Sequence, residues 1–271
     1  MIKIISNTNA EYHSGDGVSK SDLDLIHTCP EKYRYKKDNP EEEKTPALIF
    51  GAMVHKLILE PAEFNSEYAV APICDRRTKE GKELYSEYLA GKGKREAVSA
   101  EDYEKALDMA KAVMANPKAA ALLSGGETEK SYYWTDERTG ILCKCRPDKV
   151  NKGYIIDLKT TEDASPEGFS KSLNNYRYHV QAAWYLRGYE AVTGVKPEGF
   201  VFIAVEKKPP YSVAVYICND VTADIGAEEA DHDLDIYASC QESGCWYGYG
   251  GENNDVMSID LPQWKLRQYQ V

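Results

Sequence analysis

Hydrophobic residues recur at helical spacing through the first half of the chain. Four such stretches are residues 19–37, 47–60, 79–90 and 100–124. Pro30 interrupts the first stretch, Pro61 ends the second, and Ser99 precedes the last as an expected N-cap. The pattern predicts a helical part over residues 19–124.

The pattern changes near residue 129 to short runs rich in β-branched and aromatic residues. Three of them, KSYYWT, ILCKCRPDKV and GYIIDLKTT, predict an antiparallel meander. A helix over 175–193, two strands (FVFIAVE and YSVAVYI) and a helix over 220–240 follow. We therefore predict an α/β fold with a central mixed β-sheet flanked by helices. One domain is expected over 1–271, with a helical part (19–124), a sheet core (128–217) and a C-terminal helix and tail (220–271).

The length of 271 residues is enough for one domain with a sizeable core. No apolar stretch approaches the roughly 20 residues of a membrane helix, and the first residues do not resemble a secretory signal. Seven cysteines without a CxxC pair favour reduced thiols over a disulfide framework. A cytoplasmic protein with no membrane partner is expected.

The formal net charge of −11 argues at first against a nucleic-acid partner. The charge is uneven, however, and one basic cluster consists of Lys32, Arg34, Lys36 and Lys37. We predict that this cluster contacts a DNA backbone, with a solvated helix face as the equally plain alternative. Bound divalent cations would also offset local repulsion.

An acid and a lysine share one face of the last predicted strand of the meander. Side chains alternate along a strand, so Asp157 and Lys159 point to the same side. Alone, this pattern is also typical of a simple salt bridge. A tight turn brings Asp148 beside Asp157, and two adjacent carboxylates repel unless a proton or a metal holds them. The set fits Mg²⁺ or Mn²⁺ and metal-assisted phosphodiester hydrolysis, with Lys159 facing the phosphate or the attacking water.

Four further residues have an ordinary interpretation when each is taken singly. His55 on the apolar helix is more often a satisfied core residue than a ligand. Gln181 and Tyr185, four positions apart, lie on one helix face and fit its polar edge. Glu129 is one of 44 acidic residues.

The order of these residues changes their interpretation. GAMVH, Glu129, Arg-Pro-Asp148, Asp157-Leu-Lys159 and Gln181-Ala-Ala-Trp-Tyr185 resemble the motifs GxxxH, E, D, DxK and QxxxY of the RecB-like branch of the PD-(D/E)xK nucleases. The match spans residues 19–217. Within the branch, TGILCKCRPDKV and YHVQAAWYLRGYE are similar to the family of the RecE (exodeoxyribonuclease VIII) nuclease domain.

This resemblance implies a restriction-endonuclease-like PD-(D/E)xK core. It implies a Mg²⁺-dependent, ATP-independent 5′→3′ exonuclease on linear double-stranded DNA ends, which leaves 3′ single-stranded tails for phage-type recombination. A RecT-like single-strand annealing protein would be the partner, and a toroidal homotetramer the assembly. The implied metal ligands are His55, Asp148, Asp157 and the Leu158 carbonyl. Lys159 would be the catalytic lysine, Gln181 and Tyr185 would position it or the phosphate, and Glu129 would support the site.

Two departures from related proteins narrow the choice. Some branch members hold an iron–sulfur cluster with four cysteines, and the cysteines of this chain do not have that arrangement. The sequence also has no GxxxxGK[ST] phosphate loop, which disfavours an ATP-driven helicase–nuclease. The alternatives that remain open are a RecB-like nuclease of other polarity or single-strand preference, and a catalytically silent DNA-end-binding module. The motifs themselves do not encode polarity.

Overall fold

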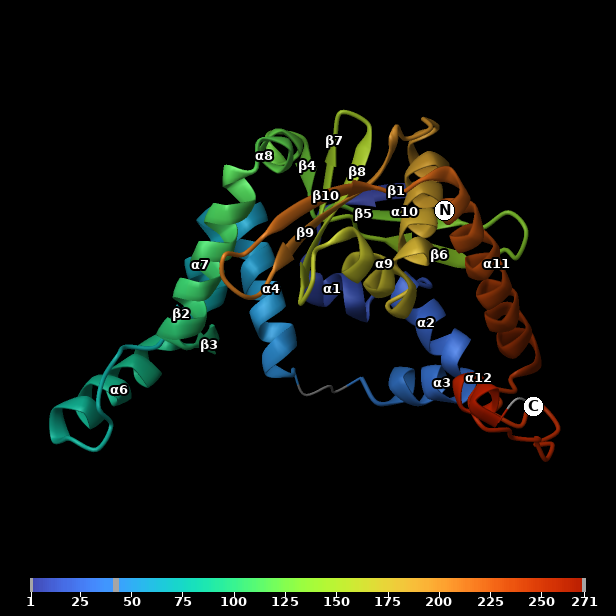
Figure 1. Ribbon diagram of the computed structural model, residues 1–271, viewed down its shortest axis with the longest axis horizontal. Coiled ribbons are helices and arrows are strands. Elements are labelled where there is room, and N and C mark those ends of the chain that lie inside the picture. The colour runs from blue at the N-terminus through green and yellow to red at the C-terminus, as the bar shows by residue number, and fades with distance from the viewer. Residues whose placement is uncertain (1, 41–43, 270–271) are drawn as a thin grey trace. The chain divides into compact units, whose positions relative to one another are not determined.

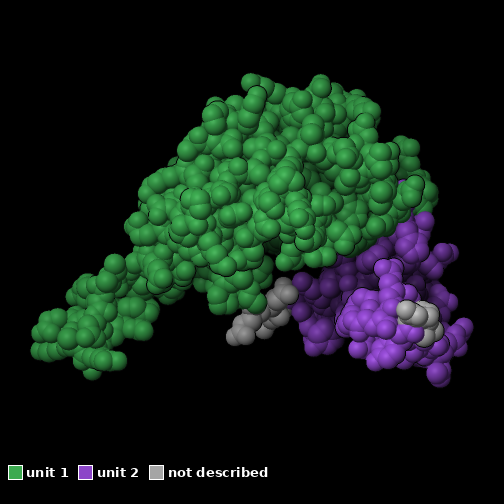
Figure 2. All heavy atoms as spheres, in the orientation of Figure 1, with its two compact units in different colours: residues 1–20, 42–230 green, residues 21–41, 231–271 purple. Residues whose placement is uncertain are grey.

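The computed structural model describes residues 2–40 and 44–269, and the chain divides into two compact units (Figure 2). Unit 1 comprises residues 1–20 and 42–230, and unit 2 comprises residues 21–41 and 231–271. Within the described ranges, no helix combines the length and the apolar character needed to cross a membrane.

A five-stranded sheet forms the centre of unit 1. Its strands are β4 (Glu127–Thr128), β7 (Lys149–Asn151), β8 (Tyr154–Thr161), β9 (Gly199–Glu206) and β10 (Val213–Ile217). Their spatial order is β10-β9-β8-β7-β4; β8 and β9 run parallel, and the other neighbours run antiparallel. The predicted central mixed sheet is confirmed.

Helices cover both faces of this sheet (Figure 1). On one face α4 (Pro46–Leu59), α7 (Ala100–Ala115) and α8 (Pro117–Leu123) share a core with the strands, and Ile156 and Leu158 of β8 point into it. On the other face, α9 (Pro166–Asn175) and α10 (Tyr178–Thr193) place rings against Phe200 and Phe202 of β9. The fold therefore has three layers, and alternation along β8 sends apolar and polar side chains to opposite faces.

The three predicted runs pair antiparallel with their neighbours in sequence, but the prediction of one three-stranded meander is wrong. β5 (Ser131–Thr135) and β6 (Leu142–Cys145) pair with each other and with β1 (Lys3–Ile5), which is followed by α1 (Asn9–Ser14). The run ILCKCRPDKV is thus two strands in two sheets, because Arg146-Pro147-Asp148 leaves the ladder between β6 and β7. Proline has no N–H to donate at this point.

A small arm of unit 1 lies between α4 and α7 along the chain. It contains η1 (Pro61–Glu63), α5 (Phe64–Glu67), β2 (Tyr68–Val70), α6 (Lys79–Lys92) and β3 (Glu96–Val98). β2 and β3 pair in parallel, and α6 connects them (Figure 1). The helix predicted over 100–124 divides here into α7 and α8, because Asn116 caps a new helix that opens with Pro117.

Unit 2 combines two helices from early in the chain with a late segment. It holds α2 (Lys20–Thr28) from Ser21 onward, α3 (Pro30–Asp38), α11 (Asp220–Ser243) from Asp231 onward, α12 (Gln263–Leu266) and η2 (Arg267–Tyr269). Pro30 is the first residue of α3, so it separates two helices as the pattern predicts. Tyr33 packs against Tyr237 and Trp246 at ring-centroid distances of 5.4 and 5.1 Å.

Gly188 of α10 lies in close contact with the three-stranded sheet of β1, β5 and β6. A Cβ at this position would lie 2.6 Å from Trp134 and 2.8 Å from Cys145 Sγ, closer than real Cβ atoms approach. We expect Gly188→Ala to lower the free energy of unfolding by about 1–3 kcal/mol, measured by urea denaturation. Gly91→Ala in α6, where nothing lies within 4 Å, is the matched control and should cause no loss.

Candidate active site

The site lies beside β8, just ahead of the first residue of β7. β7 starts at Lys149, which pairs with Ile156, so Asp148 stands just beyond the ladder and opposite Asp157. The N–H of Leu158 donates to Asp148 Oδ2 at 2.7 Å in place of a strand neighbour. Side chains from both helical layers can reach the edge of β8 at this opening.

Asp157 and Lys159 are held together by a glutamine from α10. Lys159 Nζ lies 2.6 Å from Asp157 Oδ2 and donates to Gln181 Oε1 at 2.9 Å. Gln181 Nε2 in turn donates to Asp157 Oδ1 at 2.6 Å. Burial favours the neutral amine, but the charges of Asp157 and its neighbours raise the pKa of Lys159 above its usual value. The lysine is therefore a fixed cation at this edge.

His55 reaches the same opening from α4 on the opposite layer. Its Nδ1 lies 3.4 Å from Asp148 Oδ2, and it also contacts the backbone of Leu158. Burial lowers the pKa of His55, which favours the neutral imidazole. Neutral imidazole is the form that binds metal ions.

Glu129 approaches Asp148 from the chain that enters β5. Its backbone has a positive φ of 53°, and its N–H donates to the Asp148 carbonyl oxygen at 3.2 Å. Arg146 Nε donates to Glu129 Oε2 at 2.6 Å, while Arg146 also donates to the backbone oxygen of Asn7. Burial and the Asp148 charge raise the pKa of Glu129 to about 7. Arg146 thus fixes Glu129 beside the carboxylates.

Tyr185 lies one turn beyond Gln181 on α10 and completes the group. It forms a side-chain hydrogen bond with Gln181, and burial raises its pKa well above the usual range. Its ring contacts Phe200 at a centroid distance of 6.1 Å. The structure therefore brings together seven residues predicted from the sequence: His55, Glu129, Asp148, Asp157, Leu158, Lys159 and Gln181, with Tyr185 behind Gln181.

Two residues near the site were not given a role from the sequence. Arg146 immediately precedes Pro147-Asp148, but its partner Asn7 is too distant in sequence for any local signal. Tyr178 lies three positions before Gln181 on α10, and Lys159 Nζ lies 4.4 Å from its ring centroid. The i, i+3 spacing from Gln181 was the signal that could have found it.

The donor set fits a hard divalent cation. Asp157 Oδ2 is buried, and its contact is the Lys159 ammonium at 2.6 Å. Burial and the Asp157 charge raise the pKa of Asp148 to about 8, as expected for two crowded carboxylates. Among the described residues, no three His, Cys, Asp or Glu side chains already form a closed metal cage. Mg²⁺ does not require one, because it keeps several waters and uses one or two carboxylates.

The basic cluster predicted to contact DNA lies on α3 of unit 2. Arg34 pairs with Asp38, Lys37 Nζ lies 3.2 Å from Asp22, and Lys32 lies over the Tyr249 ring. Lys36 also has an interaction partner. Acidic residues within unit 2 thus offset part of this charge, and the DNA contact stays a prediction.

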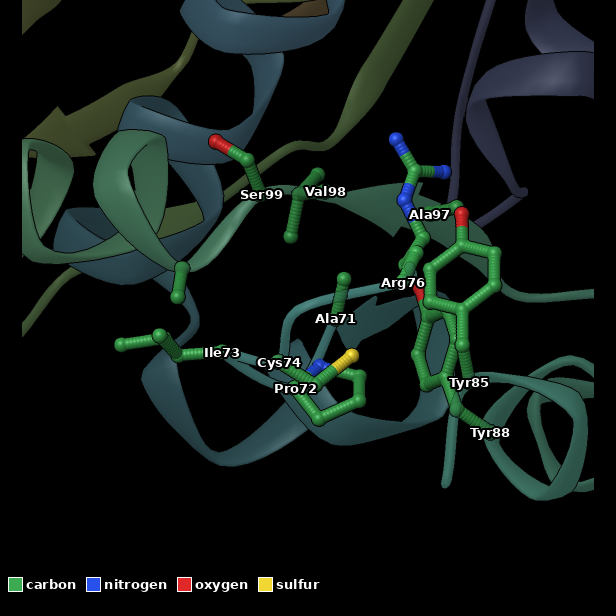
Figure 3. A pocket seen from close by; sticks show the side chains of 11 residues that line it. Ala71, Pro72, Ile73, Cys74, Arg76, Tyr85, Tyr88, Ala97, Val98 and Ser99 are labelled. Atoms are coloured by element: carbon green, nitrogen blue, oxygen red, sulfur yellow. The ribbon is translucent and has the colours of Figure 1, made fainter. Parts of the chain in front are cut away.

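A cavity of about 390 Å³ lies away from these carboxylates, in the arm of unit 1 (Figure 3). Arg76, Tyr85 and Tyr88 line one side of it, and the chain around Ala71–Cys74 lines another. The described residues that line it include no acidic side chain and no histidine. The cavity therefore lacks the groups needed for metal-assisted hydrolysis, and the opening beside β8 remains the candidate site.

Comparison with known proteins identifies the family of the chain. Residues 19–257 match the family described as a PDDEXK-like domain of unknown function, DUF3799. The chain belongs to this family. The match covers the helical layer, the whole central sheet and the site between them. No curated protein matches the chain.

Two solved structures are similar to the chain. The crystal structure named "Putative exonuclease", from Eubacterium rectale, superposes with a TM-score of 0.62 at 16% sequence identity, covering 97% of this chain and 98% of that one. The crystal structure of SSO0001 has a TM-score of 0.41 at 13% identity, covering 85% and 87%. The first supports the fold alone, and the second carries no argument.

Proposed function

We propose that this protein is a metal-dependent nuclease, and specifically an ATP-independent 5′→3′ exodeoxyribonuclease on linear double-stranded DNA. The observation that carries the proposal is the convergence of Asp148, Asp157, Lys159 and His55 at the open edge of β8. A chain of the PDDEXK-like family with this intact set has the groups that phosphodiester hydrolysis requires. The choice of an exonuclease within this class rests on the sequence resemblance to the RecE nuclease-domain family.

The contacts of each residue indicate its role in metal binding, phosphate stabilisation or positioning. Asp148, Asp157, His55 and the Leu158 carbonyl would hold Mg²⁺ or Mn²⁺, which neutralises phosphate charge and lowers the pKa of a bound water. Lys159 presents a fixed ammonium to the phosphate or the attacking water. Gln181 keeps both Lys159 and Asp157 in place through its two hydrogen bonds, and Tyr185 supports Gln181.

The biological setting is proposed on the sequence resemblance alone. It comprises 3′ single-stranded tails made for phage-type recombination, a RecT-like annealing partner and a toroidal tetramer. The cytoplasm is proposed as the compartment.

Digestion of end-labelled duplexes tests the activity and its direction together. We expect Mg²⁺-dependent release of label from 5′-phosphorylated linear duplex, with loss from the 5′-labelled strand first and no requirement for ATP. A circular duplex without ends is the control substrate and should stay intact. Loss of the 3′ label first would assign the opposite polarity. A duplex left whole with Mg²⁺ and with Mn²⁺ would support the catalytically silent DNA-end-binding module instead.

A further inference from the structure

Aromatic rings lead outward from the candidate catalytic lysine. Lys159 Nζ lies 4.4 Å from the centroid of the Tyr178 ring. The Tyr178 ring stacks on that of Tyr176, with centroids 5.5 Å apart and planes inclined by 27°. Tyr178 is half-buried against Phe169 and Phe202, whereas Tyr176 is 62% exposed. An exposed ring thus continues a stack that begins at the lysine.

The backbone between the two tyrosines is held in an unusual conformation. α9 ends at Asn175 and α10 begins at Tyr178, and Arg177 between them is left-handed, with φ of 51°. This conformation costs free energy in a residue other than glycine, so it persists where contacts enforce it.

Ion pairs with α11 supply that enforcement. Arg177 donates to Glu229 Oε2 from both Nε and a terminal nitrogen, at 3.2 and 3.1 Å, and His179 Nε2 lies 3.2 Å from the same oxygen. Lys20 Nζ donates to the Tyr176 carbonyl oxygen at 2.7 Å. These polar contacts therefore hold the bend that places Tyr176 on Tyr178. The bend does not depend on burial of the Tyr176 ring.

We propose that Tyr176 is a stacking platform for a nucleobase of the DNA strand under cleavage, with Tyr178 linking this platform to Lys159. The inference rests on the proposed nuclease function. A phosphate that faces Lys159 has its neighbouring bases within reach, because the Tyr176 centroid lies at most about 10 Å from Lys159 Nζ. That distance is the rise of roughly three nucleotides in a duplex.

Stacking also suits an enzyme that digests any sequence. Every base has a π-face, so an aromatic platform holds the strand without reading donors and acceptors on base edges. The platform would bind the bases while Lys159 and the metal ligands bind the phosphate. The expected occupant is an unpaired or fraying base at the processed end, since its face is free to stack.

Binding to a nuclease-inactive background tests this directly. Asp157→Asn protein would be titrated with a fluorescent, 5′-phosphorylated single strand, and anisotropy would report the Kd. Adding Tyr176→Ala should weaken binding at least about fivefold, whereas Tyr176→Phe should stay within about twofold, because it keeps the ring. Val195→Ala removes another exposed apolar side chain just beyond the far end of α10 and should have no effect.

An abasic strand separates stacking from a structural effect. The Asp157→Asn protein and the Asp157→Asn/Tyr176→Ala double variant should bind a strand equally well when an abasic nucleotide occupies the contacted position, because no base is left to stack. Equal affinity of these two proteins for the intact strand would overturn the platform while leaving the nuclease proposal standing. A difference that persists at every abasic position would overturn it as well. Absence of all DNA binding would overturn both.

Discussion

Asp157→Asn should reduce nuclease activity by at least about 10³-fold, which corresponds to about 4 kcal/mol of transition-state stabilisation. The substitution preserves the shape of the side chain but removes the charge that would hold the cation. Asp157 is nearly fully buried and contacts both Lys159 and Gln181, so the same change also alters the support of the lysine. Initial rates on end-labelled duplex with Mg²⁺ measure the effect.

Two controls separate lost chemistry from lost structure. Asp108→Asn removes a carboxylate on α7 that pairs with Lys111 at the surface, and it should keep full activity. Thermal unfolding of the Asp157→Asn protein with and without Mg²⁺ reports the metal: the wild type should gain stability from the ion by mass action, and the variant should gain less. Full activity in Asp157→Asn would contradict the proposed site.

Lys159→Met should lower kcat by about 10²–10³-fold and weaken DNA binding by a much smaller factor. A preorganised cation beside developing phosphate charge contributes on this scale, and its removal acts on the transition state more than on the ground state. The change also leaves Asp157 as a buried carboxylate without its cation, which destabilises the metal-free protein by about 3 kcal/mol. Added Mg²⁺ should recover part of that stability, but not the rate.

This variant distinguishes a catalytic lysine from a structural salt bridge. If Lys159 served only to neutralise Asp157, the protein would lose stability and retain kcat once Mg²⁺ restored the fold. Lys149→Met is the matched control, because Lys149 is a buried lysine of the neighbouring strand that donates to Thr128. It should leave kcat unchanged.

The sequence predicted the local parts of the site because they follow from short-range rules. Alternation along a strand places Asp157 and Lys159 on one side, and the tight turn between β7 and β8 places Asp148 opposite Asp157. The layer structure also follows from the pattern of apolar runs. A structural salt bridge and a catalytic pair would both place Lys159 beside Asp157. The Asp-Leu-Lys sequence alone therefore could not distinguish the two interpretations.

Other features depend on contacts between distant residues. In the pairing of β1 with β5, Ile5 lies opposite Ser131, which is far along the chain, and the three residues of β1 carry no pattern of their own. The division of ILCKCRPDKV between two sheets depends on β1 being present to pair with the β5–β6 hairpin. The positive φ of Arg177 is supported by Glu229, which lies on another helix. No window of sequence contains both members of such pairs.

The composition of unit 2 has a consequence for how the protein folds as it is synthesised. Its two parts, residues 21–41 and 231–271, are separated in the chain by nearly all of unit 1. Helices α2 and α3 therefore leave the ribosome long before their packing partners, the second half of α11 and the segment that carries Trp246. Until then the ring of Tyr33 lacks Tyr237 and Trp246, the rings that it packs against in the folded protein. Contacts between residues so far apart in the chain form slowly. During this delay, α2 and α3 are open to aggregation or to binding by chaperones.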